Sequence, residues 1–310
     1  MSILFASPNW SEYEQHFKNA FHKYKLDFNE ITTNLQTDKS SVEYIIYSPV
    51  SELHDFSPFI NVKAILNLWA GVEDIIKNPT LNKPLIRLVD DGMKQGMVEW
   101  CLAHVLRHHL GTDNHTKNQD GIWRSNVIPP LANEINIGVL GLGALGAAVA
   151  QSLAYIGFHV TGMSQTKKNL SNVKSVFGLD ALNVVLKSSQ ILILLLPLTP
   201  KTSNLLNKKT LTILPKGAII INPGRGALIN EIDLLNSLNS GHVRHATLDV
   251  FSKEPLEASH PFWTHPKVTV TPHIAAHTRP RSSAETITRS IVKLRNGETP
   301  VGFVNREKFY

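Results

Sequence analysis

Residues 135–146 read INIGVLGLGALG, an apolar run followed by glycines at Gly141, Gly143 and Gly146. In a dinucleotide site the first glycine allows a tight turn, the second lets backbone N–H groups approach a pyrophosphate, and the third lets helix and strand pack closely. An ordinary turn would also use glycines. The small residues of 144–150 favour a helix packed on a sheet, so we expect a phosphate site at Gly141, Gly143, Ala144, Leu145 and Gly146.

Apolar runs and amphipathic segments alternate on both sides of this turn, as in a parallel sheet covered by helices. The second half predicts a helix over 144–155 and strands over 135–140, 159–163, 191–196, 218–221, 245–249 and 268–271. The first half predicts a smaller α/β unit with a helix over 12–23 and strands over 2–5, 44–47, 64–67 and 85–87. A helix over 93–109 is expected to link two domains, and one over 278–296 to close the chain.

Composition bounds the class of protein. The chain has 310 residues, of which 42% are hydrophobic, and no apolar run approaches the roughly 20 residues that cross a bilayer. There is one cysteine, Cys101, whose place in an apolar helical pattern indicates packing and not catalysis. We therefore expect a soluble cytoplasmic protein without a disulfide, a cysteine-built metal site or a membrane partner.

The formal net charge is +6, but the lysines and arginines are scattered. No basic run with interleaved aromatic residues is present, so a nucleic-acid partner is not expected. The chain has 14 histidines, including His108, His109 and His115. Neighbouring positions on a helix point in different directions, and no HExxH pattern accompanies these histidines, so we expect no metal.

The end of the second strand bears on which dinucleotide binds. An NAD site commonly has an acidic residue there, about 20 residues after the glycines, which bonds the adenosine ribose. This chain instead has Ser164, Gln165, Thr166, Lys167 and Lys168. Without an acid to repel a 2′-phosphate and with two lysines to attract one, NADPH is predicted, with NADH possible at lower preference. The other interpretation of the lysines is a solvated loop.

Three further polar segments follow predicted strands: NPGRG at 222–226, DVFSKEP at 249–255 and PHIAAHT at 272–278. The carboxyl ends of parallel strands are where open α/β sheets bind ligands. In order along the chain, GLGALG, LLPLTPKT, INPGRGALI, LDVFSKEPL and TPHIAAHT resemble the D-isomer-specific 2-hydroxyacid dehydrogenase family, from about residue 65 onward. RLVDDGM, the serine-type strand end and TPHIAAHTRP resemble its glyoxylate/hydroxypyruvate reductase A group.

The resemblance implies an α/β fold of two domains. A Rossmann dinucleotide-binding domain at 101–277 would be inserted into a smaller flavodoxin-like substrate domain made of 1–100 plus 278–310. It also implies a catalytic set. His273 matches the general acid, Glu254 its acidic partner and Arg225 the residue that binds the substrate carboxylate and polarises the carbonyl oxygen.

Other positions carry over from the family in the same way. Trp69, Ala70, Gly71 and Val72 match a substrate loop whose N–H groups receive the carboxylate, although Glu73 stands where the family usually has Asp. Met93 is expected to line the substrate pocket. Cofactor contacts are expected from Asp249 at the nicotinamide carboxamide, from Leu196 and Pro197 beside the nicotinamide ribose, and from Thr202 near the diphosphate.

The function expected on these grounds is the reduction of small 2-oxo acids, such as glyoxylate or hydroxypyruvate, to the D-2-hydroxy acids glycolate or glycerate, by a homodimer. Two alternatives stay open at this point. One is an NAD-dependent enzyme of the phosphoglycerate or D-lactate type. The other is a cofactor-sensing binding protein without activity, because corepressors share the fold.

Overall fold

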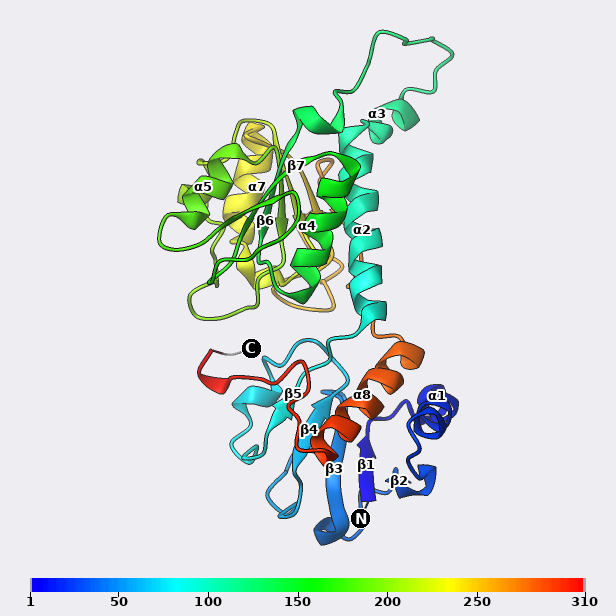
Figure 1. Cartoon of the computed structure of the whole chain (residues 1–310). Helices are drawn as coiled ribbons and strands as arrows, with labels where there is room; N and C mark the ends of the chain where they lie inside the picture. Colours follow the sequence, from blue (N-terminus) through cyan, green and yellow to red (C-terminus); the bar gives the residue numbers. More distant parts are fainter. Residues whose placement is uncertain (1, 309–310) are drawn as a thin grey trace. The chain divides into compact units, whose positions relative to one another are not determined.

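The computed structural model describes residues 2–308 and divides the chain into two units (Figure 1). The first unit comprises residues up to Met93 together with those from Thr278 onward, and the second unit is Lys94–His277. The first unit is thus interrupted in sequence by the second. The boundary expected between residues 100 and 101 falls inside one helix, α2 (Asp91–His109), whose residues from Lys94 belong to the second unit.

The first unit is built on a five-stranded parallel sheet in the order β2-β1-β3-β4-β5. This is the strand order of flavodoxin-like folds. Its strands are β1 (Ser2–Ala6), β2 (Ile31–Thr32), β3 (Val42–Tyr47), β4 (Ala64–Asn67) and β5 (Leu85–Ile86). It also contains the helices α1 (Trp10–Lys23) and α8 (Pro280–Arg295), and α8 comes from the C-terminal part of the sequence.

The second unit contains a seven-stranded parallel sheet in the order β12-β11-β10-β9-β6-β7-β8. Its strands are β6 (Asn136–Leu140), β7 (His159–Met163), β8 (Val173–Val176), β9 (Ile191–Leu194), β10 (Ala218–Asn222), β11 (Val243–Leu248) and β12 (Val268–Val270). Besides α2 its helices are α3 (Thr112–Lys117), α4 (Ala144–Ile156), α5 (Ala181–Ser188), α6 (Lys208–Leu211) and α7 (Glu231–Ser240). The order reverses between β6 and β9, the switch point at which doubly wound sheets bind nucleotides.

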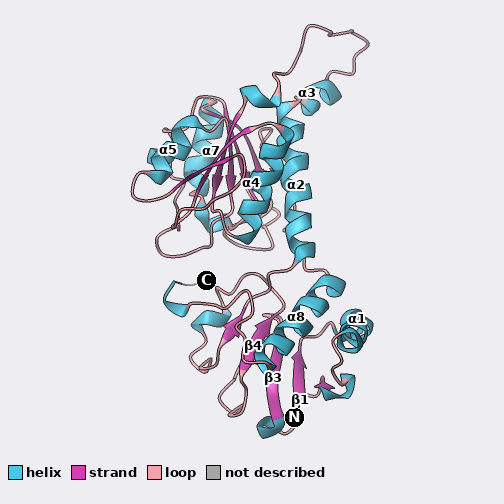
Figure 2. Ribbon diagram, in the orientation of Figure 1, coloured by secondary structure: helices cyan, strands magenta, loops and turns pink. Residues whose placement is uncertain are grey.

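Helices cover both faces of this sheet, which explains the continuous apolar runs (Figure 2). In β9, Ile191 and Ile193 pack in one core with residues of α2 and α4. Leu192 and Leu194 pack in the other core with residues of α5 and α7. Alternate side chains of one strand therefore pack into two cores, one on each face of the sheet.

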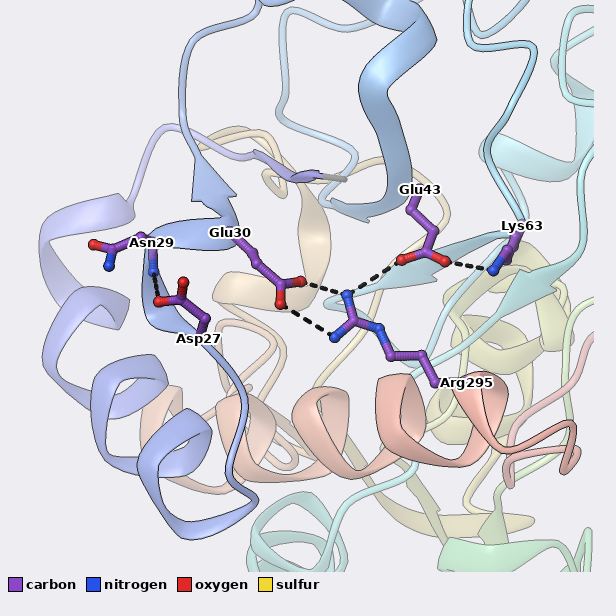
Figure 3. Close-up of polar contacts among 6 residues, drawn as sticks. All are labelled: Asp27, Asn29, Glu30, Glu43, Lys63 and Arg295. Carbon is purple, nitrogen blue, oxygen red and sulfur yellow. Dashed lines mark hydrogen bonds and ion pairs between the residues drawn. The ribbon is translucent and has the colours of Figure 1, made fainter.

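A charged network joins α8 to the sheet of the first unit (Figure 3). Arg295, the last residue of α8, contacts both Glu30 and Glu43, and Lys63 contacts the other oxygen of Glu43. Glu43 lies in β3 and is 5% exposed. The network therefore joins α8 to β3, the middle strand of the first sheet.

The structure adds elements that the sequence pattern did not predict, among them the edge strand β8 and the helices α5 and α7. Strand β8 carries the exposed Lys174 and has no continuous apolar run, because an edge strand is not enclosed by neighbours on both sides. Within residues 2–308, no helix is long and apolar enough to cross a bilayer.

Candidate active site

The glycine turn connects β6 to α4. Gly141 has a φ of 105°, and a Cβ added there would lie 2.5 Å from the carbonyl oxygen of Leu195. At Gly146 an added Cβ would lie 1.8 Å from the carbonyl oxygen of Gly141. Both positions therefore require glycine, one for backbone conformation and close approach and the other for helix packing.

Gly143 faces open space, since an added Cβ would meet nothing within 4 Å. It is the N-cap of α4, where no side chain caps the helix. The first amide N–H groups of a helix have no acceptor within the helix, and the helix dipole favours negative charge beside them. The N–H groups of Gly143, Ala144 and Leu145 thus fit a phosphate group of a dinucleotide.

Hydrogen bonds within the loop after β7 and from the loop to β8 stabilise its conformation. The Ser164 hydroxyl donates to the carbonyl oxygen of Thr166 at 2.7 Å, and the Lys168 amide donates to the Ser175 hydroxyl at 3.1 Å. The side chains of residues 165–168 are exposed. The loop therefore presents lysines and no carboxylate.

The loop after β9 contains three of the expected cofactor contacts. Leu196 and Pro197 are half-buried. The Thr202 hydroxyl donates to the carbonyl oxygen of Pro197 at 2.7 Å and accepts from the Thr199 amide at 2.8 Å. In this structure Thr202 braces its own loop, and its contact near a diphosphate stays a prediction.

Arg225 lies just beyond the carboxyl end of β10, in a turn organised by Asn222. The buried Asn222 side chain accepts from the Gly224 amide at 3.1 Å and donates to the Arg225 carbonyl oxygen at 2.9 Å. The Arg225 guanidinium donates to the Gly224 carbonyl oxygen at 2.7 Å. Residue 226 must be glycine, because an added Cβ would lie 1.9 Å from the carbonyl carbon of Phe251.

Glu254 and His273 meet after β11 and β12. Oε2 of Glu254 lies 2.6 Å from Nδ1 of His273, and Oε1 accepts from the Phe251 amide at 2.9 Å. Burial alone would raise the pKa of Glu254, but the hydrogen bonds from His273 and Phe251 and the charges of His273 and Arg225 outweigh it and leave the pKa below its ordinary value. An ionised Glu254 can accept a hydrogen bond from Nδ1 of His273 and so orient the ring.

Comparison with known proteins agrees with this geometry. Residues 100–275 match the family model described as D-isomer specific 2-hydroxyacid dehydrogenase, NAD binding domain. The glyoxylate/hydroxypyruvate reductase A of Yersinia enterocolitica is 38% identical over 88% of this chain and 89% of its own length. The chain belongs to the D-isomer-specific 2-hydroxyacid dehydrogenase family.

Solved structures of this dehydrogenase family extend the likeness over the whole chain. A member from Xanthobacter autotrophicus, in complex with NADPH and MES, has a TM-score of 0.91 and 36% identity and covers 100% of this chain and 99% of its own. The NADPH-dependent glyoxylate/hydroxypyruvate reductase from Sinorhizobium meliloti, in complex with NADP and sulfate, has a TM-score of 0.88 and 29% identity at 100% coverage of both chains. The two-domain fold and the use of a nicotinamide cofactor are thereby established for this dehydrogenase.

The expected substrate loop of the dehydrogenase lies in the first unit, after β4. The buried Asn67 side chain donates to the carbonyl oxygens of Trp69 and Gly71, each at 2.9 Å, and so fixes the turn around Ala70, which Val72 follows. The Met93 amide donates to Asp90 at 2.5 Å. That Trp69–Val72 and Met93 bind the substrate stays a prediction. The effect of Glu73 on the shape of the loop stays a prediction as well.

The sequence did not reveal that Asn222 organises the turn before Arg225. It also did not reveal that Asp249 accepts hydrogen bonds from the loop that contains His273. Asn222 directly precedes Pro223 and Gly224, and a polar residue at the end of an apolar strand is a signal for such a turn. Asp249 was expected to contact the cofactor, and the structure shows it buried and bonded to the His273 loop.

Proposed function

We propose that this dehydrogenase reduces small 2-oxo acids, such as glyoxylate and hydroxypyruvate, to the D-2-hydroxy acids glycolate and glycerate with NADPH. The observation that carries the proposal is the 2.6 Å pair of His273 and Glu254, with the charge of Arg225 acting on the same carboxylate. Related proteins named glyoxylate/hydroxypyruvate reductase A support the choice of substrates.

The three side chains divide the chemistry. The carboxylate of Glu254 accepts from Nδ1 of His273, so Nε2 is left to donate a proton to the substrate carbonyl oxygen. Arg225 binds the substrate carboxylate and stabilises the negative charge that develops on that oxygen. The cofactor supplies the hydride to the carbonyl carbon, so one hydride and one proton convert the ketone or aldehyde to an alcohol. Trp69–Val72 and Met93 are proposed as further substrate contacts.

Activity with a panel of 2-oxo acids tests the proposal, followed by the loss of NADPH absorbance. Glyoxylate and hydroxypyruvate are expected among the best substrates. His273→Ala should lower kcat by about 10²–10⁴-fold, the usual contribution of a general acid. Phosphoglycerate or D-lactate chemistry at higher efficiency, or NADPH binding without turnover on any member of the panel, would instead support the alternative functions.

The preference for NADPH over NADH is supported by the exposed lysines after β7 and by the NADPH and NADP complexes of the structural relatives. Lys167→Glu places a negative charge where the 2′-phosphate is proposed to bind. We expect the ratio of catalytic efficiencies, NADPH over NADH, to fall roughly tenfold. Lys187→Glu, an exposed lysine of α5, is the control that should leave the ratio unchanged. A natural chain that prefers NADH would contradict the assignment.

A homodimer is part of the proposal. The segment after α3 extends away from the sheet of its own unit (Figure 1), and it exposes Ile122, Ile128 and 91% of the Trp123 side chain. Exposed apolar clusters of this kind mark association surfaces. Light scattering should give twice the chain mass, and Trp123→Ser should shift the protein toward monomer. A cytoplasmic location is also proposed.

A further inference from the structure

Asp249 is a fully buried carboxylate at the carboxyl end of β11, with 0% of its surface exposed. A buried carboxylate destabilises a protein strongly unless hydrogen bonds replace its hydration. Its amide donates to the Asn222 carbonyl oxygen at 3.0 Å, which links it to the turn that carries Arg225. Asp249 therefore lies between the loops of the catalytic set.

Within residues 2–308, the hydrogen bonds that the Asp249 carboxylate accepts all come from one loop, the one after β12. Oδ1 accepts from the Thr271 hydroxyl at 2.5 Å and from the Ile274 amide at 2.9 Å. Oδ2 accepts from the Ala275 amide at 2.9 Å. The main-chain carbonyl oxygen of Asp249 accepts from the His273 amide, also at 2.9 Å. Asp249 thus holds the loop at Thr271, at His273 and at the two residues that follow His273.

The backbone of His273 needs such support, because its φ is 55°. A left-handed conformation is uncommon for residues other than glycine and persists only where surrounding contacts impose it. The same conformation directs the ring so that Nδ1 lies 2.6 Å from Glu254. The bonds to Asp249 therefore support the backbone conformation from which the His273 ring reaches Glu254.

We propose that Asp249 is a positioning residue, which holds His273 in the left-handed conformation that pairs the ring with Glu254. The proposal rests on the proposed function for its effect on turnover. It differs from the nicotinamide contact that the family resemblance implies, because a cofactor contact acts on NADPH affinity whereas a positioning residue acts on proton donation. The two roles can therefore be separated by measuring binding and turnover independently.

Asp249→Asn is the decisive variant. The side chain keeps its size, but its NH2 group now faces one of the two amide donors, at Ile274 or at Ala275, which loses its acceptor. We expect kcat to fall by about 100-fold, within the range for a general acid, while the Kd for NADPH measured by fluorescence changes by less than about threefold. Hydrogen exchange should show faster exchange of the amides of residues 273–275.

Two matched variants accompany it. Thr271→Val removes only the hydroxyl donor. It should lower kcat by about three- to tenfold, less than Asp249→Asn, because the hydrogen bonds from the Ile274 and Ala275 amides to Asp249 stay. It also keeps the test decisive if Asp249→Asn does not fold. Asp233→Asn alters another carboxylate that accepts a main-chain amide, that of Lys208 at 2.8 Å, away from the catalytic set, and should change neither kcat nor loop exchange.

An NADPH Kd raised tenfold or more with kcat retained would overturn the proposal in favour of the cofactor contact. Loss of turnover with unchanged exchange at residues 273–275 would overturn it as well. If the natural chain turns over none of the 2-oxo acids, the proposed function fails. Exchange of the loop amides and NADPH binding in Asp249→Asn then still decide whether Asp249 holds the loop.

Discussion

Glu43 of the first unit and Asp249 of the second unit are both buried carboxylates, and they are stabilised by opposite means. Glu43 of the first unit is surrounded by cations, with Lys63 on one oxygen and Arg295 at 3.2 Å from the other. Asp249 of the second unit is surrounded by two main-chain amides and a hydroxyl, none of which carries a charge. Both are less than a tenth exposed.

The difference indicates what each arrangement is for. A cation interacts with a carboxylate from many directions, so the Glu43 network tolerates small shifts and mainly joins distant parts of the chain: Arg295 is 252 positions from Glu43. Amide donors require a defined orientation, so the bonds to Asp249 determine backbone conformation at His273. We infer that the first carboxylate serves stability and the second serves catalytic geometry.

The largest effect is expected from removing the shared cation of the first unit. In Arg295→Met, Lys63 is the one cation left beside Glu43, and Glu30 loses its ion pair with Arg295. Breaking a buried ion pair from one side costs about 3–5 kcal/mol, and because Arg295 is one quarter exposed we expect about 3 kcal/mol of unfolding free energy to be lost. Urea denaturation measures it.

The control is Arg295→Lys, which keeps the positive charge but loses the fork that reaches both glutamates, and should recover part of the loss. The Kd for NADPH should be the same in both variants, because the network lies in the first unit. Equal stability of Arg295→Met and the natural chain would refute the assignment of Glu43 as a charge-compensated group.

Part of this comparison was predictable from the sequence. Strands such as β9 (Ile191–Leu194) are apolar throughout because both faces are buried, and that pattern is visible without a structure. The positions of Gly141 and Gly146 follow from steric requirements of a turn. Glu254 and His273 could be paired through the family motifs, and their 2.6 Å contact follows from adjacent strand ends.

The rest left no local signal. Glu43 and Arg295 resemble any exposed charged residues until the fold brings them together. The donors to Asp249 are main-chain amides, which every residue has, so the sequence cannot show which of them an aspartate will bind. Burial and hydrogen bonding of a single polar residue are therefore properties of the fold and not of a motif.

Acidification should distinguish the two units. In the second unit, burial lowers the pKa of His108 to about 3 and of His245 to about 4, with help from nearby positive charge such as Arg107. In the first unit, burial would raise the pKa of Glu43, but Lys63 and Arg295 outweigh it and lower the pKa.

The direction in which the free energy of unfolding changes with pH depends on the protons taken up on unfolding. Unfolded histidines take up protons below about pH 6.5, so the stability that neutral His108 and His245 contribute is complete above that pH and declines toward pH 4. The contribution of Glu43 is complete above about pH 4.5 and is lost as the pH falls through its lowered pKa. The second unit should therefore lose hydrogen-exchange protection first.

His108→Gln tests the cause. Glutamine does not titrate and can replace the 2.8 Å hydrogen bond between Nε2 of His108 and the Thr247 hydroxyl. The stability of the second unit, followed by exchange in β11, should then fall less steeply between pH 6.5 and 4, while exchange in β3 of the first unit stays as in the natural chain. An unchanged slope in β11 would mean that other groups cause the acid sensitivity.

The smallest effect is expected at the exposed side of the Glu43 network. Lys63→Met removes the second cation, but the Lys63 side chain is 57% exposed, so water and salt already screen its charge. The destabilisation should be less than half that of Arg295→Met and should shrink further in high salt.

Lys23→Met, which breaks the exposed pair with Glu285, is the reference for a pair without a buried partner and should leave the unfolding midpoint unchanged. If Lys63→Met loses as much unfolding free energy as Arg295→Met, the Glu43 network acts by charge alone and the forked contact of Arg295 contributes nothing.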